Sequence, residues 1–293
     1  MRSLVSVNGK ITQGQDAKVS VFDRGFLFGD AVYETGRTYD RVCVYLEEHW
    51  ARLRRSAGRL EIKLPWKDDE LTKGLFEVLA QFNQPGVYFR TIVTRGEVGS
   101  VSLDLEPSSG PTLVHLVTEL NADKITSLQA TGLRVATAGI IRNSSNAQDP
   151  NIKTSNYLNC LLALFDARRK GGQDAILCDR EGHVTEGTTF SVFAVSQSGE
   201  LWTPSLEVGI LDSITRRHVL EVARPLMPVR EGFFQLEAFR GAREVFIASS
   251  VREIVPITQW DSVDYGPDRP HTRRLQEKLK EHVRLHVLGQ PRF

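Results

Sequence analysis

The chain contains 293 residues, of which 41% are hydrophobic and 25% charged, and its formal net charge is +1. These values are typical of a globular protein of one large or two medium domains, and they favour neither nucleic acid nor an anionic membrane as a partner. Three cysteines without a Cys-x-x-Cys pair argue against a disulfide framework or a zinc site. No signal-peptide core or membrane-spanning apolar run is present, so we expect a cytoplasmic protein.

The first half of the chain predicts an α/β arrangement. Apolar and polar residues alternate around Asn8-Gly9, a dipeptide typical of a tight β-hairpin turn. A second strand pair is expected in residues 31–46, with its turn at Asp40-Arg41. Two helices and two further strands follow, at residues 46–60, 68–82, 87–95 and 112–120.

The second half begins after a polar stretch near residues 121–127. We therefore expect a small N-terminal domain (residues 1–119), a linker (120–130) and a larger domain (131–293). The larger domain should contain strands at 133–140 and 244–249, hairpins that turn at 180–182 and 198–199, and a charged helix at 272–288.

Residues 149–171, DPNIKTSNYLNCLLALFDARRKG, hold a single lysine in an extended piece before a predicted helix. Asn156 is a candidate cap of that helix, and Gly171 should end it. Apolar residues recur in it at helical spacing: Leu158, Leu161, Leu162 and Phe165. Lys153 could attack a carbonyl only with a neutral amine, which burial or a nearby cation favours. Taken alone, however, this lysine is more simply a solvated loop residue.

Several common catalytic motifs are absent from the sequence. It contains no GxGxxG, GxxxxGK[ST], HExxH or GxSxG pattern, which argues against dinucleotide, P-loop, zinc-protease and serine-hydrolase chemistry. The seven histidines show no metal-ligand spacing, so no metal site is predicted.

Five further segments accompany the lysine segment in a fixed order. They are FDRGFLFGDAVYETGR (22–37), EEHWARLRRSA (47–57), VTEGTTFSVF (184–193), GILDSITRRHVLEVA (209–223) and VFIASSVREIVPI (245–257). Together the six segments resemble the fold-type IV pyridoxal-phosphate enzymes, the class IV aminotransferases. The family includes branched-chain and D-amino-acid aminotransferases and aminodeoxychorismate lyase. The resemblance implies a small α/β domain, a larger β-rich α/β domain, and pyridoxal 5'-phosphate in the cleft between them.

The resemblance also implies roles for single residues. Lys153 would form the Schiff base (internal aldimine) with the cofactor and would shuttle the substrate proton. Glu186 would pair with the pyridine nitrogen and keep it protonated. Tyr157 would bind the phenolic oxygen of the cofactor, and Arg52 would hold its phosphate.

The remaining cofactor contacts would come from two turns. Leu211 would pack on one face of the ring. Ser213, where the family usually has glycine, is the expected cap of a helix whose Ile214 and Thr215 N–H groups would bind the phosphate. The hydroxyl of Ser250 would donate to the same phosphate.

Residues of two strands would line the substrate pocket. Tyr33, Thr35 and Arg37 alternate onto one face of the first strand, and Tyr88 and Arg90 share a face of the second. Two arginines suggest a carboxylate group, such as that of an amino acid or of 2-oxoglutarate. Each arginine could instead be paired and structural. The resemblance adds Val251 to the substrate positions.

The sequence motifs do not agree on one substrate class. YFRTIVTRGEVGS lacks the arginine and histidine of the D-amino-acid branch, whereas AVYETGR departs from the branched-chain pattern FEGxR. We favour a transaminase for hydrophobic or branched α-amino acids and a 2-oxo acid acceptor. The alternatives are a D-amino-acid aminotransferase, aminodeoxychorismate lyase and a non-catalytic protein of the same fold.

A homodimer is expected from the same resemblance. The loop GEVGSVSLDL (96–105) would then close the pocket of the other subunit. An ordinary surface loop is the alternative interpretation.

Overall fold

The computed structural model describes residues 2–101, 103 and 110–293, and the chain divides into two compact units. The first unit comprises Met1–Leu120, Ile152–Asn156 and His286–Phe293. The second comprises Asn121–Asn151 and Tyr157–Leu285. The expected linker, residues 120–130, lies mostly in helix α4 (Ala122–Thr131) of the second unit. The segment that carries Lys153 belongs to the first unit, which the sequence did not suggest.

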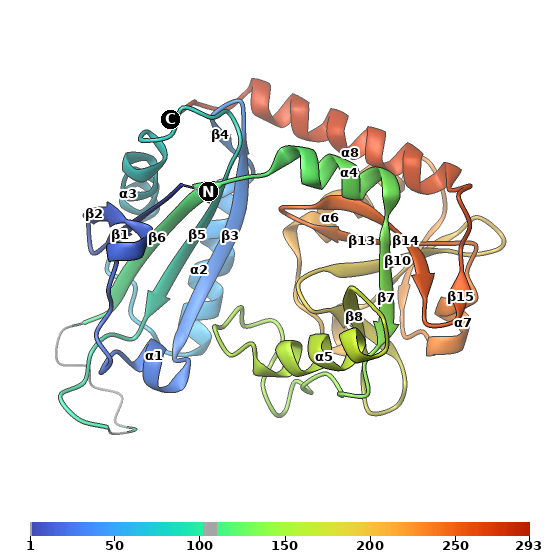
Figure 1. The fold of residues 1–293 in the computed structure, drawn as a ribbon, viewed down its shortest axis with the longest axis horizontal. Coiled ribbons are helices and arrows are strands. Elements are labelled where there is room, and N and C mark those ends of the chain that lie inside the picture. The colour runs from blue at the N-terminus through green and yellow to red at the C-terminus, as the bar shows by residue number, and fades with distance from the viewer. Residues whose placement is uncertain (1, 102, 104–109) are drawn as a thin grey trace. The chain divides into compact units, whose positions relative to one another are not determined.

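The first unit is built on an antiparallel sheet with the strand order β2-β1-β6-β5-β3-β4 (Figure 1). Its elements are β1 (Ser3–Val7), β2 (Lys10–Gln13), η1 (Gly14–Asp16), α1 (Arg24–Phe28), β3 (Ala31–Tyr39), β4 (Val42–Cys43), α2 (Leu46–Arg59), α3 (Asp68–Leu79), β5 (Val87–Thr94) and β6 (Thr112–Glu119). The expected helices and strands of this half are confirmed to within about one turn.

Both predicted turns of this sheet are confirmed. Asn8 and Gly9 join β1 to β2 with φ angles of 49° and 86°, and Asp40 and Arg41 join β3 to β4 with φ angles of 47° and 66°. Two successive left-handed residues give the turn whose twist matches that of paired strands.

Helices α2 and α3 pack on one face of the sheet. Trp50 and Leu53 of α2 share a buried core with Phe89 and Val117 of the strands. Along β3 the residues alternate, so that Val32 and Glu34 face this core while the neighbours of Glu34 face the other way. The face opposite the core therefore carries the residues predicted to bind substrate.

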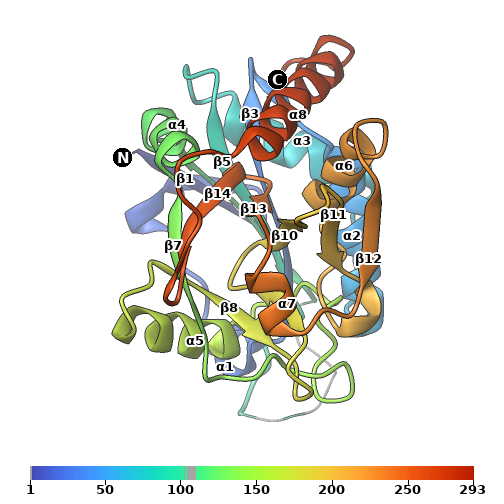
Figure 2. The same ribbon diagram turned by 90° about the vertical axis from the view of Figure 1, so that its right-hand side faces the viewer.

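The second unit contains a strongly curled sheet with the order β12-β11-β10-β13-β14-β7-β8-β9, with β15 paired to β14 (Figure 2). Its other elements are β7 (Leu133–Thr137), α5 (Leu158–Arg169), β8 (Asp174–Cys178), β9 (Val184–Gly187), β10 (Ser191–Val195), β11 (Leu201–Pro204), η2 (Leu206–Val208), α6 (Ile214–Ala223), β12 (Val229–Gly232), α7 (Leu236–Arg240), β13 (Glu244–Ser249), β14 (Glu253–Trp260), β15 (Val263–Asp264) and α8 (Pro270–Leu288). The mixed α/β class predicted from the sequence is confirmed.

Helix α5 differs from its prediction at its N-cap. Tyr157, and not Asn156, occupies the N-cap position, and the Asn156 side chain donates to the carbonyl of Gly29 instead. The helix packs on β7 and β8 through Ala163 and Ala167. The four apolar residues named above, Leu158, Leu161, Leu162 and Phe165, are 44–67% exposed. We call them the α5 apolar face.

Helices α6 and α8 share a buried core with strands β10 and β13. The first turn of α8 is held by Glu244, whose fully buried carboxylate accepts from the N–H groups of His271 and Thr272 and from the Thr272 hydroxyl. A negative charge at a helix N-terminus satisfies amides that have no partner within the helix. Among the described residues, no helix has the length and apolar character required to cross a bilayer.

Candidate functional site

The segment that carries Lys153 pairs with strand β3. The N–H of Tyr33 donates to the carbonyl of Lys153 at 3.0 Å, and the N–H of Ser155 donates to the carbonyl of Ala31 at 2.9 Å. Val32 and Thr154 form an isolated antiparallel bridge between the same two stretches. These bonds fix the backbone of Lys153 relative to the sheet of the first unit.

The amine of Lys153 lies against an aromatic ring. Its Nζ is 3.2 Å from the Tyr33 hydroxyl and 4.2 Å from the centroid of that ring. The guanidinium carbon of Arg90 lies 3.8 Å from the same centroid. The Lys153 amine and the Arg90 guanidinium therefore contact one buried tyrosine, whose π-face attracts a cation held over it.

The predicted substrate residues lie side by side on β3 and β5. Thr35 pairs with Arg90 and Arg37 pairs with Tyr88, so that the two strands present one continuous face, as the alternation predicted. Burial raises the pKa of Tyr88, although the charge and hydrogen bond of Arg90 oppose this shift. Arg90 Nε is buried and has no hydrogen-bond partner within the described part of the chain. A donor of this kind suits a carboxylate ligand.

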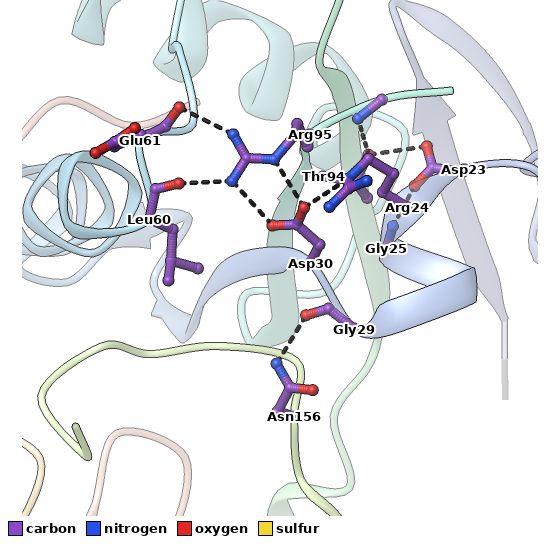
Figure 3. Close-up of polar contacts among 11 residues, drawn as sticks. Asp23, Arg24, Gly25, Gly29, Asp30, Leu60, Glu61, Thr94, Arg95 and Asn156 are labelled. Atoms are coloured by element: carbon purple, nitrogen blue, oxygen red, sulfur yellow. Dashed lines mark hydrogen bonds and ion pairs between the residues drawn. The ribbon is translucent and has the colours of Figure 1, made fainter. Parts of the chain in front are cut away.

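A buried ion-pair network holds the start of β3 (Figure 3). Asp30 accepts from Arg95 at 2.7 Å and from Arg24 at 2.8 Å. Arg95 also donates to the carbonyls of Leu60 and Glu61. Burial alone would raise the pKa of Asp30, but the bonds and charges of the two arginines outweigh it and lower the pKa. The network joins the end of α2 to β3 and β5.

The lysine segment is also attached to helix α1. Asn156 donates its side-chain amide to the carbonyl of Gly29 at 3.0 Å (Figure 3). Gly29 ends α1 in the left-handed conformation, with φ of 67°, and a Cβ atom there would lie 2.4 Å from Asn156 Oδ1. Glycine is required at this position by both the backbone angle and the contact.

Arg52, the predicted phosphate ligand, lies in the core of the first unit. Its Nε and one Nη each donate to the Glu34 carboxylate at 2.7 Å, and His49 Nδ1 lies 2.7 Å from the same carboxylate. Complete burial would raise the pKa of Glu34, but the charge and bonds of Arg52, with the bond from His49, hold it at about 2. Burial lowers the pKa of His49, although the hydrogen bond and charge of Glu34 oppose this shift. The phosphate role of Arg52 stays a prediction.

In the second unit, Glu186 pairs with an arginine that the sequence analysis did not select. Arg142 donates to Glu186 Oε1 at 2.9 and 3.1 Å, and the N–H of Leu211 donates to Oε2 at 3.3 Å. Burial lowers the pKa of Arg142, but Glu186 reverses the effect and raises it. Arg142 also contacts Asn159 and interacts electrostatically with Tyr157. Its only sequence signal is a lone arginine in the polar stretch after β7.

The predicted phosphate contacts of this unit also come together. Ser213 caps α6, as predicted, by accepting from the N–H of Arg216. The hydroxyls of Thr215 and Ser250 lie 3.2 Å apart. Ile214 and Thr215 are the first residues of the helix, where N–H groups have no partner within the helix. Val251 lies in the same turn as Ser250.

The predicted site residues thus form groups within each unit. Lys153, Tyr33, Arg90 and their strand neighbours lie together in the first unit, where Arg52 is bound to Glu34. Glu186, Leu211 and Tyr157 gather around Arg142 in the second, and Thr215 contacts Ser250. The predicted pocket-closing loop, residues 96–105, extends beyond the described residues at Ser102, Asp104 and Leu105.

Comparison with known sequences gives consistent matches over most of the chain. The family model described as Amino-transferase class IV matches residues 31–260. A putative branched-chain-amino-acid aminotransferase of Methanocaldococcus jannaschii is 36% identical over 94% of this chain and 95% of that protein. D-alanine aminotransferase of Listeria monocytogenes is 33% identical over 95% and 96%. Aminodeoxychorismate lyase of Bacillus subtilis is 29% identical over 98% and 97%.

Solved structures agree with these matches. A branched-chain aminotransferase of Thermoproteus uzoniensis, crystallised with norvaline, has a TM-score of 0.87 at 27% identity and covers 97% of this chain and 95% of its own. A branched-chain amino acid aminotransferase from T.th., crystallised with pyridoxamine 5'-phosphate, has a TM-score of 0.87 at 25% identity, with coverage of 97% and 94%.

The buried Glu34–Arg52 pair predicts a pH-dependent loss of stability in Glu34→Gln. Because the pKa of Glu34 falls from an ordinary 4.5 to about 2, its ionised form contributes about 3 kcal/mol to the free energy of unfolding at neutral pH. This contribution is complete above about pH 5 and is lost as the pH falls towards 2. Urea unfolding followed by tryptophan fluorescence should therefore show a large difference from wild type at pH 7 and a smaller one at pH 3. Glu47→Gln, at an exposed position of helix α2, which carries Arg52, is the control. A difference that does not change with pH would contradict the assignment.

Proposed function

Because the chain belongs to the amino-transferase class IV family, we propose that it transfers the amino group of a hydrophobic or branched α-amino acid to a 2-oxo acid such as 2-oxoglutarate. The family and the aminotransferases among the relatives support a transaminase that depends on pyridoxal 5'-phosphate. The observation that carries the substrate proposal is the face of β3 and β5, where the Lys153 amine and the Arg90 guanidinium meet at Tyr33.

The cofactor supplies an aldehyde that accepts an amino group and a ring that withdraws electrons from the substrate Cα. The residues of the first unit suit it at its aldehyde end. Lys153 Nζ is the amine that would hold the aldehyde and would then carry the proton removed from Cα. The Tyr33 hydroxyl, 3.2 Å away, would orient Nζ by a hydrogen bond.

The second unit offers partners for the ring nitrogen and the phosphate. Arg142 pairs directly with the Glu186 carboxylate and orients it. Glu186 would then accept a hydrogen bond from the protonated nitrogen of the ring. The Thr215 and Ser250 hydroxyls and the first N–H groups of α6 form a set of donors for a phosphate. In the first unit, Arg52 stays the predicted guanidinium ligand of the phosphate.

The substrate carboxylate would bind to the arginines of the strand face. Arg90 supplies a buried donor without a hydrogen-bond partner within the described residues, and Arg37 stands on the same face. Ile92 lies next to them on β5, paired with Tyr33. A cationic anchor beside an apolar side chain suits an amino acid with a hydrophobic side chain.

The alternatives differ from this proposal in the donor that they accept or in the product that they release. The matches to a D-alanine aminotransferase and to an aminodeoxychorismate lyase support these two reactions as alternatives. A D-amino-acid enzyme would accept the opposite series of donors, and the lyase would release pyruvate without consuming a 2-oxo acid.

The rate of transamination should depend on the amino-acid donor. We expect the protein, loaded with pyridoxal 5'-phosphate, to form glutamate from 2-oxoglutarate with L-leucine, L-isoleucine and L-valine and to react more slowly with their D forms. Lys153→Ala should lower the rate by about 10³-fold or more, because it removes the group that moves the proton. Lys124→Ala, at an exposed lysine of α4, should leave it unchanged. Chiral chromatography of the amino acids measures which donor is consumed and how much glutamate each variant forms. Reaction with D-donors only, or pyruvate release from aminodeoxychorismate, would replace the proposal with one of the alternatives.

Arg90 should matter only for donors with a carboxylate. Arg90→Leu removes a charge-assisted hydrogen bond, so KM for L-leucine should rise by about 10- to 100-fold. The rate with 1-phenylethylamine, a donor without a carboxylate, should stay within a few-fold of its wild-type value. Arg274→Leu, at an exposed position of α8, is the matched control. Equal losses with both donors would show that Arg90 supports the fold and not the carboxylate.

We further propose that the chain forms a homodimer. The α5 apolar face exposes four large side chains on one side of a single helix. Contiguous apolar surface of this kind on a globular protein marks an interaction site. The resemblance to the family predicts a homodimer, so the partner that we propose is a second copy of the chain.

The dimer should depend on the α5 apolar face. Wild-type protein should elute with twice the chain mass in size-exclusion chromatography with light scattering. The double variant Leu161→Asp/Phe165→Asp should shift to the mass of one chain, because charged residues cannot be buried unpaired at an interface. Leu285→Asp, at another exposed leucine, should remain dimeric. A double variant that keeps the wild-type mass would exclude this face from the interface.

A further inference from the structure

Three potential metal ligands meet between helices α6 and α8, and none has a part in the proposed reaction. His218 and Glu221 lie one turn apart on α6, and His282 faces them from α8. Residues three apart in a helix share a face, so both α6 side chains point towards the same neighbour. The two histidines therefore come from two helices and lie 64 positions apart in the chain.

The spacing of the ligand atoms fits one ion. His218 Nδ1 and His282 Nε2 are 3.0 Å apart, and Glu221 Oε2 lies 3.4 Å from the first and 3.8 Å from the second. The point equidistant from these three atoms lies about 2.0 Å from each, which is the bond length of Zn²⁺ to imidazole nitrogen and carboxylate oxygen. An ion slightly out of their plane would complete three corners of a tetrahedron.

The chemistry of the contact also favours a cation. Two imidazole nitrogens that face each other at hydrogen-bond distance are compatible only if one carries a proton, whereas both lone pairs can bind one metal ion. The carboxylate of Glu221 offsets half of the charge of a divalent ion. The side chain of Glu221 is 63% exposed, that of His282 27% and that of His218 12%, so solvent reaches the cluster on one side. A water molecule could therefore enter and occupy the fourth position.

A second cluster in the chain provides a comparison. Asp179, Glu181 and His183 also bring three ligand atoms together, but they lie within one hairpin turn. Asp179 already accepts from the backbone N–H and the ring of His183. This cluster has one nitrogen ligand, and its contacts are those of an ordinary turn. It serves as the matched control.

We propose that His218, Glu221 and His282 bind a divalent transition-metal ion of the Zn²⁺ class, which cross-links α6 to α8. Two imidazoles and one carboxylate select such ions over Mg²⁺ and Ca²⁺, which prefer all-oxygen sites. The cross-link would stabilise the second unit and is independent of the catalytic proposal.

The test uses holoenzyme freed of metal with a chelator and then titrated with ZnCl₂. Calorimetry should show one equivalent bound to wild type, and the melting temperature should rise by a few degrees at saturating Zn²⁺. His282→Ala and the surface variant Glu221→Ala should each weaken binding by at least tenfold, whereas His183→Ala should bind like wild type. MgCl₂ should have no effect.

A spectroscopic readout complements the titration. Co²⁺ bound at the site should give visible bands above 500 nm, and these should disappear in His218→Ala/His282→Ala. Zn²⁺ binding that is unchanged in His282→Ala and Glu221→Ala, or that is lost in His183→Ala, would overturn the proposal. So would a wild-type protein that binds no more Zn²⁺ than the double variant.

Discussion

The pairing of residues 152–156 with strand β3 is the constraint on which the candidate site depends. A lysine in a free loop would sample many positions, whereas backbone bonds on both sides of Lys153 limit it to one register against Ala31–Tyr33. That register sets its amine beside the Tyr33 hydroxyl. Shifting the segment by one residue would turn Lys153 to the other face of the pairing. Gly29 supports the register because only glycine leaves room for Asn156 there.

The first unit stabilises this arrangement with buried ion pairs as well as with apolar packing. Glu34 with Arg52 lies in its interior, and Asp30 with Arg95 and Arg24 is largely buried. Such pairs add little net stability compared with apolar residues, but losing one partner is costly because the other charge stays buried. Their value lies in specificity, since a bidentate pair fixes the angle of α2 to β3 in a way that apolar contacts do not.

Local features of the fold could be predicted from the sequence, and long-range ones could not. The hairpins at Asn8-Gly9 and Asp40-Arg41 were predictable because adjacent residues determine a turn. The shared face of β3 and β5 followed from alternation alone. The Glu186–Arg142 pair spans 44 positions and leaves no periodic signal. The leucines of helix α5 recur at helical spacing, which predicted the helix, but only tertiary structure shows that alanines, and not leucines, face the sheet.

Arg52 shows how a structural pair and a ligand contact can coexist. A guanidinium has five N–H donors, and Glu34 accepts from Nε and one Nη. Replacing Glu34 with a phosphate would leave a fully buried carboxylate without its cation, at a cost of several kcal/mol. A phosphate that binds Arg52 while the pair with Glu34 stays intact avoids this cost, and Glu34 then orients the guanidinium. In the role proposed for Arg52, Glu34 is therefore part of the phosphate site, although it touches no phosphate itself.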